Sequence, residues 1–366
     1  MKSYGHLFNE VLLRDDTMSS TIDKAADGKN KNNKRHCKLR YIRAHKDEYI
    51  PKIKSWIINY EPAKITRIVK VINDGISAKK RTITVPTYQE EEILNAETIV
   101  LKQILEPSMY EHSYSSIEGR GTHKASNFIA KWMKRDCVGT QFALQMDIHH
   151  FFESINRSIL YSKIKKKIRD KDFLNLCRKT IYATPGNFGL PLGFPTSQTY
   201  ANYYLTDLDH YIKERLGAKY YVRFSDDMLI MSNNKSFLWY CKDRIEDYLE
   251  KNLCLTLKPN YKIFPLDHSN PSLMGNKLDF LGYKHARDYK TLRKKILGRF
   301  KRKVHHVHKK GCANIKDARQ IVTYASYLKH AKCHGWYERE IKPYVNLRYM
   351  RIKISRYSKR RNAYVV

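Results

Sequence analysis

The sequence is short of acidic residues. Its 366 residues include 36 Asp and Glu against 70 Lys and Arg, which gives a formal net charge of +34. That balance argues against an enzyme of small neutral metabolites. It predicts a polyanionic partner, because Lys and Arg release counterions from a phosphate backbone. The apolar share of 42% suffices for a folded core and excludes a wholly disordered chain.

Long apolar runs are also missing. None approaches the roughly 18 residues of a membrane span, and Met228–Met231 is typical of those present. Met1–Val11 has no apolar signal-peptide core. The seven Cys, an odd number at irregular spacing, predict free thiols in a reducing compartment. We therefore expect a cytoplasmic protein of two or three subdomains with no membrane partner.

The N-terminal part is basic and polar. Asp23–Lys46 contains Gly28–Asn33, which has no apolar area to bury, so this stretch is predicted to be a mobile loop. Apolar residues then recur at helical spacing over Lys46–Tyr60. Further on, the patterns predict a strand, a turn, a return strand and a helix, at Ile65–Ile72, Asn73–Gly75, Lys80–Val85 and Gln89–Glu106.

Three acids follow strand-like runs. Asp147 ends a run in which Phe142, Leu144 and Met146 alternate, the pattern of a half-buried strand. Asp226 and Asp227 lie between Tyr220–Phe224 and Met228–Met231, which predicts a hairpin with the acids at its tip. Adjacent carboxylates repel unless a cation neutralises them. Two Mg²⁺ ions held there would suit phosphoryl transfer. Taken alone, however, an Asp-Asp pair is more typical of a solvated turn.

Two basic runs lie beyond Tyr283. The first has seven cations and no acid, and we expect it to open a helical segment that tracks a nucleic-acid duplex: Arg293, Lys294, Lys295, Arg299, Lys301, Arg302 and Lys303. The alternative, a merely solvated helix face, usually mixes charge signs. The second run, Arg348–Arg361, interleaves its cations with Tyr349, Ile352, Ile354 and Tyr357, which suits RNA stacking or a partner surface.

Seven segments in order resemble the motifs of reverse transcriptases. They are Lys79–Pro86, Glu118–Lys124, Gln145–Ile155, Gly189–Gln198, Phe224–Asp227, Leu255–Phe264 and Leu278–Tyr283. The resemblance implies an α+β right-hand polymerase with fingers, a palm built on an antiparallel sheet, and a helical thumb. It divides the chain into a basic N-terminal extension of loop and helix (1–64), fingers and palm (65–283), a thumb (284–345) and a basic C-terminal tail (346–366).

The fourth motif narrows the resemblance. Most reverse transcriptases have Gln-Gly there and a Pro after the Ser, whereas this chain has Leu192-Gly193 and Ser197-Gln198, followed by Ala201–Leu205. That pattern is similar to the enzymes of diversity-generating retroelements, as are Leu257–Asn260 and Tyr324–Ala331. The resemblance implies an RNA-directed DNA polymerase, bacterial or phage-encoded, that copies a structured template RNA into cDNA with errors at adenines. It also implies a small oligomeric accessory protein and an RNA–DNA duplex as partners.

By the same resemblance, Asp147, Asp226 and Asp227 are catalytic and bind two Mg²⁺ ions, with Ile148 beside them. The dNTP substrate would meet Lys80, Arg81, Arg120, His150, Phe151, Phe152, Leu192, Lys258 and Lys262. Phe152 stands at the steric-gate position, where a bulky ring excludes a 2′-hydroxyl; core packing is the alternative. Lys258 and Lys262 remain equal candidates for the proton donor to pyrophosphate.

Template contact and fidelity are implied for Leu192, Gly193, Ser197 and Gln198. Leu192 cannot make the hydrogen bond that Gln would make near the nascent pair. A net hydrogen bond contributes about 0.5–1.5 kcal/mol, so its loss relaxes selectivity without explaining a bias toward adenine.

Three other interpretations stay open. The chain could be another bacterial reverse transcriptase, from a phage-defence system, a retron or a group II intron. It could be a catalytically silent RNA-binding scaffold, although the three intact Asp argue against that. A zinc site could form from His and Cys of the last part, but their spacing fits no structural zinc pattern: His305, His306, His308, Cys312, His330, Cys333 and His334.

Overall fold

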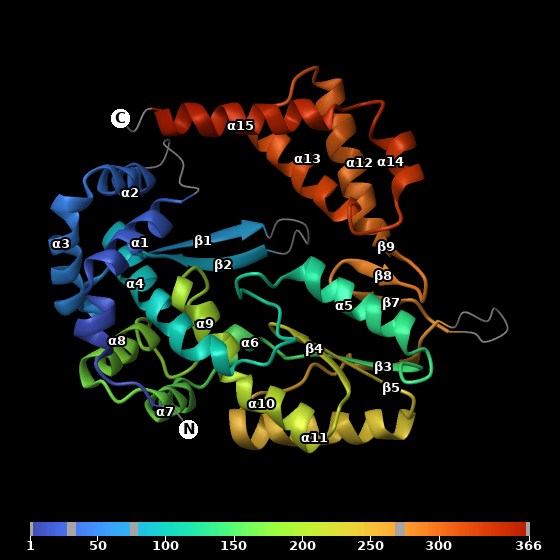
Figure 1. Ribbon diagram of the computed structural model, residues 1–366, viewed down its shortest axis with the longest axis horizontal. Coiled ribbons are helices and arrows are strands. Elements are labelled where there is room, and N and C mark those ends of the chain that lie inside the picture. Colours follow the sequence, from blue (N-terminus) through green and yellow to red (C-terminus); the bar gives the residue numbers. More distant parts are fainter. Residues whose placement is uncertain (1–2, 28–33, 74–79, 268–274, 364–366) are drawn as a thin grey trace.

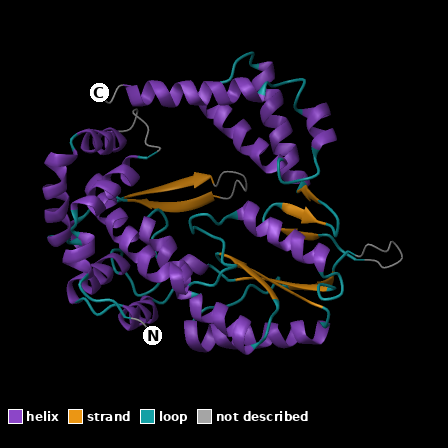
Figure 2. Cartoon of the chain, in the orientation of Figure 1, coloured by secondary structure: helices purple, strands orange, loops and turns teal. Residues whose placement is uncertain are grey.

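A computed structural model describes residues 3–27, 34–73, 80–267 and 275–363 (Figure 1). Helices dominate, and the strands form three antiparallel sheets, as Figure 2 shows. The predicted α+β class is confirmed. Within these ranges no helix is both long and apolar enough to cross a membrane. The predicted turn after Asn73, the centre of the basic loop and Lys79 lie outside the described residues.

The first part of the chain is a helical layer around one long helix, α4. Its elements are η1 (Phe8–Leu12), α1 (Asp15–Ala26), α2 (Lys34–Ala44), α3 (Lys46–Ile58), η2 (Pro62–Lys64), α4 (Tyr88–Leu105) and η3 (Glu106–Ser108). Ile93, Ala96, Val100 and Ile104 of α4 are buried, as their spacing predicts. The prediction of a loop over Asp23–Lys46 is wrong at both ends. Leu39 and Ile42 supply an apolar stripe that packs α2 into the core despite its basic composition.

A two-stranded ribbon projects from this layer. β1 (Ile68–Asn73) pairs antiparallel with β2 (Lys80–Val85), which confirms both predicted strands. Four apolar side chains of β1 are largely exposed: Ile68, Val69, Val71 and Ile72. Near the end of β2 the ribbon is tied to the rest of the fold, because the Thr84 amide donates to the Leu192 carbonyl.

A four-stranded sheet in the order β4-β5-β3-β6 carries the acidic residues. Its strands are β3 (Phe142–Asp147), β4 (Tyr220–Phe224), β5 (Asp227–Ser232) and β6 (Lys262–Pro265). The alternation before Asp147 predicts a half-buried strand, but the sheet is covered on both faces. Leu144 packs into the large core, and Ala143 packs against the cluster that includes Ile129 and Met133 of helix α5 (Thr122–Arg135).

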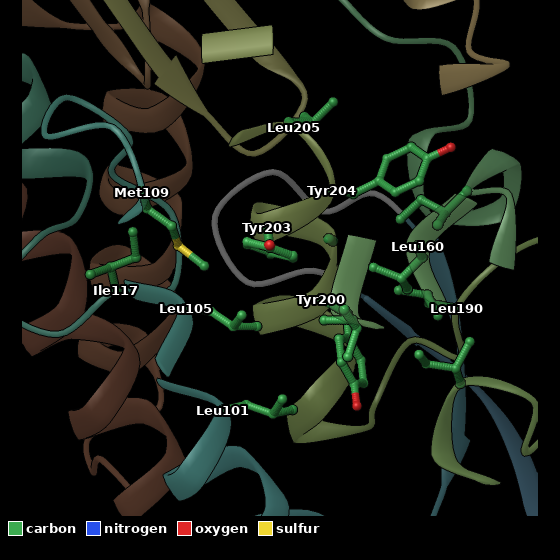
Figure 3. Packing of buried hydrophobic residues seen from close by; sticks show 14 of the residues in the cluster. Leu101, Leu105, Met109, Ile117, Leu160, Leu190, Tyr200, Tyr203, Tyr204 and Leu205 are labelled. Carbon is green, nitrogen blue, oxygen red and sulfur yellow. The ribbon is translucent and has the colours of Figure 1, made fainter. Parts of the chain in front are cut away.

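Further helices follow in the middle of the chain, and the first and last of them pack directly against this sheet. They are α5 (Thr122–Arg135), α6 (Phe151–Ser154), α7 (Arg157–Lys167), α8 (Lys171–Ile181), α9 (Pro195–Tyr204), α10 (Thr206–His210), the π-helical turn η4 (Tyr211–Arg215) and α11 (Lys235–Leu253). Figure 3 shows α9 meeting α4, with Tyr200 and Tyr203 facing Leu101 and Leu105. This packing fixes α9, and with it the loop that precedes it, against the rest of the core.

The last part begins with a small sheet of β7 (Leu278–Phe280), β8 (Tyr283–His285) and β9 (Lys290–Leu292). A helical bundle follows, made of α12 (Lys294–Lys309), α13 (Ile315–Leu328), α14 (His334–Glu340) and α15 (Leu347–Ala363). The predicted tail is therefore mostly helix. Met350 of α15 is buried in the same cluster as Phe300 of α12 and Ile321 of α13, so α15 belongs to the bundle.

Candidate active site

The acidic hairpin forms as predicted. Phe224 at the end of β4 pairs with Asp227 at the start of β5, which leaves Ser225 and Asp226 as a two-residue turn. Ser225 adopts a positive φ of 58°, as the tight turns that match the twist of a hairpin require. The turn therefore places the Asp226 side chain at the sheet edge, directly beside Asp227.

The third carboxylate comes from the neighbouring strand. In the β3–β5 register Asp147 lies opposite Asp227, and the Ile148 amide donates to the Asp226 carbonyl at 3.4 Å. Directly opposed residues on antiparallel strands have Cβ atoms about 4.5–5.5 Å apart, where like charges destabilise the sheet. The fold thus gathers the three predicted acids at one edge.

Lys258 is a cation that contacts Asp147. The Lys258 amide donates to the Asp147 carbonyl at 2.8 Å, and its ammonium forms an ion pair with the Asp147 carboxylate. Lys262, by contrast, lies in β6 opposite Gln145 and is exposed. Of the two candidate proton donors, Lys258 is the one that reaches the acidic edge.

The acidic edge suits a further cation. Asp147 Oδ1 is buried and meets no hydrogen-bond donor within the described part of the chain, and burial together with the Asp147 charge raises the pKa of Asp226. Both features indicate that Lys258 does not fully neutralise the negative charge of these carboxylates. Carboxylate oxygens are the ligands that Mg²⁺ prefers. In the described residues no three His, Cys, Asp or Glu side chains form a preassembled metal cluster.

The raised pKa of Asp226 makes a prediction for pH. Its carboxyl holds a proton to higher pH than an ordinary Asp, so a proton would compete with any cation that binds there. The folded chain without metal gains stability from the protonated form at low pH and loses it as pH rises through the raised pKa. Asp226→Asn should therefore raise the melting temperature in EDTA at neutral pH, by roughly 2 °C, and flatten that pH dependence. Calorimetry at several pH values measures both, and an unchanged profile would contradict the assignment.

The loop before α9 lies against the β1–β2 ribbon. The Leu192 carbonyl accepts the Thr84 amide at 2.7 Å, and Ser197 Oγ donates to the Pro191 carbonyl at 2.8 Å. Gly193 has a φ of 113°, and a Cβ there would overlap the Thr84 carbonyl oxygen. A glycine is therefore required at this crossing. Gln198, one turn into α9, is exposed.

Gly193→Ala should therefore lower the free energy of unfolding by about 1–3 kcal/mol, the usual range for a residue forced into a rarely populated conformation. Gly217→Ala is the matched control, because Gly217 also has a positive φ, of 71°, but a methyl group added there would meet no atom within 4 Å. Urea unfolding compares the two. Equal losses would show that the contact with Thr84 adds nothing to the strain.

Residues 72–284, more than half of the chain, match a protein family described as "Reverse transcriptase (RNA-dependent DNA polymerase)". The chain belongs to the reverse transcriptase family. The match includes the acidic edge, the second strand of the ribbon and the loop before α9.

Similar curated proteins include intron proteins and a retron reverse transcriptase. An uncharacterized 91 kDa protein in the cob intron of Schizosaccharomyces pombe is 29% identical over 175 residues, 46% of this chain and 21% of that protein. The group II intron-encoded protein LtrA of Lactococcus lactis is 27% identical over 176 residues, 42% of this chain and 29% of LtrA. The chain thus spans less than a third of the length of either.

The retron Ec73 reverse transcriptase of Escherichia coli is 23% identical over 227 residues, 57% of this chain and 69% of that enzyme. Among solved structures, apo telomerase from Candida tropicalis aligns with 76% of this chain and 57% of its own, at 13% identity and a TM-score of 0.49.

The steric-gate candidate of this reverse transcriptase lies on the short helix α6. His150 precedes it with a φ of 43°, Phe151 is buried, and Phe152 is half-buried, with its ring centroid 5.5 Å from that of Phe151. The Phe152 carbonyl accepts the Leu190 amide at 2.8 Å. That bond ties α6 to the loop that carries Leu192, so the two predicted nucleotide-contacting segments are held together.

The predicted phosphate-binding cations divide into two groups. Lys80 and Arg81 are exposed at the start of β2, as a grip on a triphosphate requires. Arg120 is half-buried, and its Nη1 donates to the carbonyls of Tyr110 at 2.8 Å and Ser113 at 2.9 Å. Arg120 therefore braces the loop that precedes α5, a function its motif did not reveal.

The basic run of the predicted thumb is partly neutralised by acids from elsewhere in the fold. Arg293 pairs with Asp279, Lys301 with Glu340 and Lys303 with Asp317. Lys294, Lys295 and Arg302 are exposed on α12. Although the run itself contains no acid, several of its cations therefore form ion pairs with acids from other elements. The three exposed cations are the best candidates for contact with a duplex.

Three His residues of the last part contact other aromatic rings. His305 and His308 meet the Tyr344 ring, at centroid distances of 4.2 and 5.3 Å. His330 stacks on His123 of α5 at 4.4 Å.

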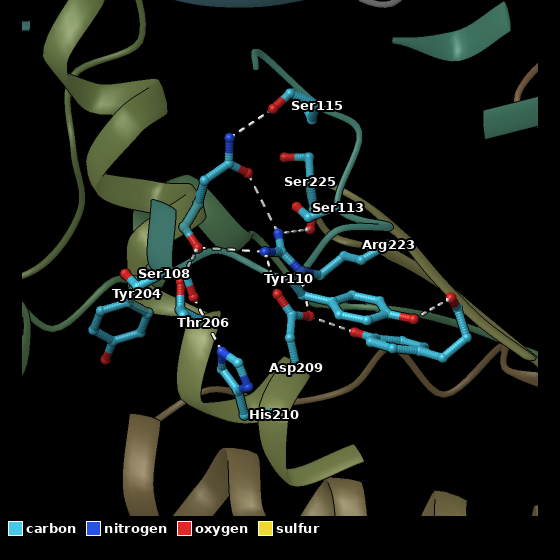
Figure 4. Close-up of polar contacts among 12 residues, drawn as sticks. Ser108, Tyr110, Ser113, Ser115, Tyr204, Thr206, Asp209, His210, Arg223 and Ser225 are labelled. Carbon is cyan, nitrogen blue, oxygen red and sulfur yellow. Dashed lines mark hydrogen bonds and ion pairs between the residues drawn. The ribbon is translucent and has the colours of Figure 1, made fainter. Parts of the chain in front are cut away.

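A buried polar network beneath the acidic hairpin was not predicted from the sequence. Arg223, the last residue but one of strand β4, is fully buried and forms an ion pair with the fully buried Asp209 of α10 (Figure 4). Burial by itself would lower the pKa of Arg223, but Asp209 raises it. A charged residue between apolar neighbours two positions before the Ser-Asp-Asp turn was the available signal.

Proposed function

We propose that this reverse transcriptase is an RNA-directed DNA polymerase of a diversity-generating retroelement. The observation that carries the catalytic part is the juxtaposition of Asp147 and Asp227 in register, with Asp226 at the adjoining turn. The three acids would hold Mg²⁺, which when bound activates a primer 3′-hydroxyl and neutralises the triphosphate. The rest of the chemistry falls to the chain's own side chains.

The chain's residues would act as follows. Lys80 and Arg81 hold the triphosphate through charge-assisted hydrogen bonds, and Phe152 excludes a ribose 2′-hydroxyl. Lys258, held beside Asp147, is placed to donate a proton to the departing pyrophosphate. Lys294, Lys295 and Arg302 of α12 neutralise duplex phosphates.

Primer extension tests the catalytic part. The full chain is incubated with an RNA template, a DNA primer, dNTPs and Mg²⁺, with and without its own template RNA and accessory protein. Incorporation is expected. No incorporation under any of these conditions would support an RNA-binding scaffold instead.

The retroelement assignment rests on Leu192-Gly193, in the loop that contacts the ribbon, and on Ser197-Gln198, in the first turn of α9. A structured template RNA and a small oligomeric accessory protein are part of this proposal. The similarity to an intron protein and to a retron enzyme favours a second candidate, a reverse transcriptase of one of those systems. Sequencing cDNA made on the native template separates the two, because only the first predicts errors concentrated at template adenines.

Leu192→Gln tests the fidelity part of the proposal. A glutamine amide can hydrogen-bond near the nascent pair, and one such bond is worth a factor of a few to about tenfold in selectivity. We expect fewer misincorporations at template adenines, by that factor. Leu192→Met, which adds no hydrogen-bonding group, is the control. An adenine error rate that is the same in wild type and Leu192→Gln would contradict a role for Leu192.

A further inference from the structure

The carbonyl oxygen of Ser225, inside the acidic turn, accepts a hydrogen bond from Arg223 Nη1 at 3.1 Å. The same guanidinium donates twice to Asp209, from Nε to Oδ1 and from Nη2 to Oδ2, both at 2.7 Å. Both side chains are fully buried, and Figure 4 draws them with their hydrogen-bond partners. A planar guanidinium bound in this two-point manner has a fixed orientation, so its third contact fixes the turn.

Arg223 also contacts α9, the helix that follows the loop carrying Leu192 and Gly193. Arg223 Nη1 lies 3.4 Å from Asn202 Oδ1, and Nη2 donates to the Asn202 carbonyl at 3.3 Å. Asn202 lies on α9, which begins two residues after Gly193. It belongs to the Ala201–Leu205 segment, to which the proposed function assigns no role.

The loop over residues 110–115 closes the network from the other side. Asn202 Nδ2 donates to the Ser115 carbonyl at 2.6 Å, and the Arg223 backbone exchanges hydrogen bonds with the loop, from its amide to the His112 carbonyl at 3.1 Å and from the Tyr114 amide to its own carbonyl at 3.0 Å. Arg120 braces this loop. Helix, loop and turn therefore converge on one guanidinium.

From this geometry we infer that Arg223 is a positioning residue for the metal-binding turn, and that Asn202 couples the turn to α9. The inference rests on the proposed polymerase function but concerns a different group of residues. A displacement of α9 by template would reach Asp226 through Asn202, Arg223 and Ser225, a continuous chain of hydrogen bonds and backbone. Asp226 would then adopt its metal-binding position best when a template is bound to the loop that carries Leu192 and Gly193.

The test compares variants that do and do not touch the turn. Arg223→Lys keeps a cation near Asp209 but loses the planar fork, and Asn202→Ala removes a smaller part of the network should Arg223→Lys fail to fold. Two controls match them in burial. Tyr221→Phe removes a 2.7 Å bond to the same Asp209 carboxylate, and Tyr204→Phe removes a bond from α9 to the Leu253 carbonyl.

The first readout needs no catalysis. Hydrogen–deuterium exchange of a peptide spanning 221–229 is measured in the metal-free full chain, and Mn²⁺ binding is titrated by electron paramagnetic resonance. Arg223→Lys should accelerate exchange at the turn and weaken Mn²⁺ binding, each about tenfold, with smaller changes for Asn202→Ala. Both Tyr→Phe controls should match wild type.

Two further measurements separate positioning from general destabilisation. In primer extension Arg223→Lys should lower kcat and leave KM for dNTP unchanged, and high Mn²⁺ should restore part of kcat. Adding an RNA–DNA duplex should slow exchange at the turn in wild type but not in Asn202→Ala. If Arg223→Lys shows the same hydrogen exchange at the turn and the same Mn²⁺ affinity as the Tyr→Phe controls, the inference is overturned, even if the polymerase proposal holds. If the duplex slows hydrogen exchange at the turn equally in wild type and Asn202→Ala, the coupling through Asn202 is overturned.

Discussion

Asp147→Asn is expected to reduce primer extension by about a thousandfold or more. Asn keeps the shape of the side chain but removes the charge opposite Asp227, and metal stabilisation of a phosphoryl-transfer transition state contributes several kcal/mol; about 4 kcal/mol corresponds to roughly a thousandfold in rate. Single-turnover extension on a preformed RNA–DNA duplex measures the loss directly.

The control for this variant is Asp243→Asn. Asp243 lies on α11 with a largely exposed side chain, which pairs with the neighbouring Lys242. It should extend primers at the wild-type rate. Duplex binding should be unchanged in both variants, because the basic surface is intact. Activity of Asp147→Asn within tenfold of wild type would remove the acidic edge from the mechanism.

Asp209→Asn should have the largest effect on stability, lowering the free energy of unfolding by about 3–5 kcal/mol. The reason is that Arg223 would remain buried with a charge that no carboxylate compensates. Urea unfolding followed by circular dichroism measures the change. Replacing both partners with apolar residues, as Asp209→Leu with Arg223→Met, should recover much of that loss while leaving the turn without its hydrogen bond.

An exposed ion pair provides the comparison. Arg14 and Asp16 form one at 3.0 Å with both side chains largely exposed, and Asp16→Asn should change stability by less than about 1 kcal/mol. If Asp209→Asn costs no more than Asp16→Asn, the Arg223 network contributes no more than a surface contact does, and its role at the turn falls with it.

Asp147→Asn and Asp209→Asn separate a role in catalysis from a role in stabilising the fold. Asp147→Asn removes a carboxylate at the acidic edge of the sheet and should leave the fold intact. Asp209→Asn alters no residue of the acidic edge, yet should disturb Ser225 and the turn from beneath. A polymerase that lost activity equally in both, with equal loss of stability, would indicate that the acidic residues matter only for folding.

Local sequence determined the elements that carry the acids. Alternation in β3 and the run on either side of Ser225-Asp226 specify strands and a tight turn, because side-chain period and turn conformation are local properties. The seven motifs in order also predicted the reverse transcriptase family. What local pattern could not give was pairing across the chain: Asp147 opposite Asp227, Lys258 on Asp147, and acids from β7, α13 and α14 on the cations of Arg293–Lys303.

Tertiary structure alone decided the role of the buried polar residues. Nothing in the sequence around Asp209 sets it apart. Asn202 lies in a segment that resembles a family pattern, but the pattern does not say what its side chain contacts, and Arg120 suggested a phosphate contact. Their functions depend on which carbonyl or carboxylate lies within hydrogen-bonding distance after folding, and a buried charge persists only where the fold supplies such a partner. The same holds for α2, whose composition predicted a loop although α1 and α4 give Leu39 and Ile42 a core in which to pack. Composition predicts a polyanionic partner, and packing determines which of the chain's charges remain exposed to meet one.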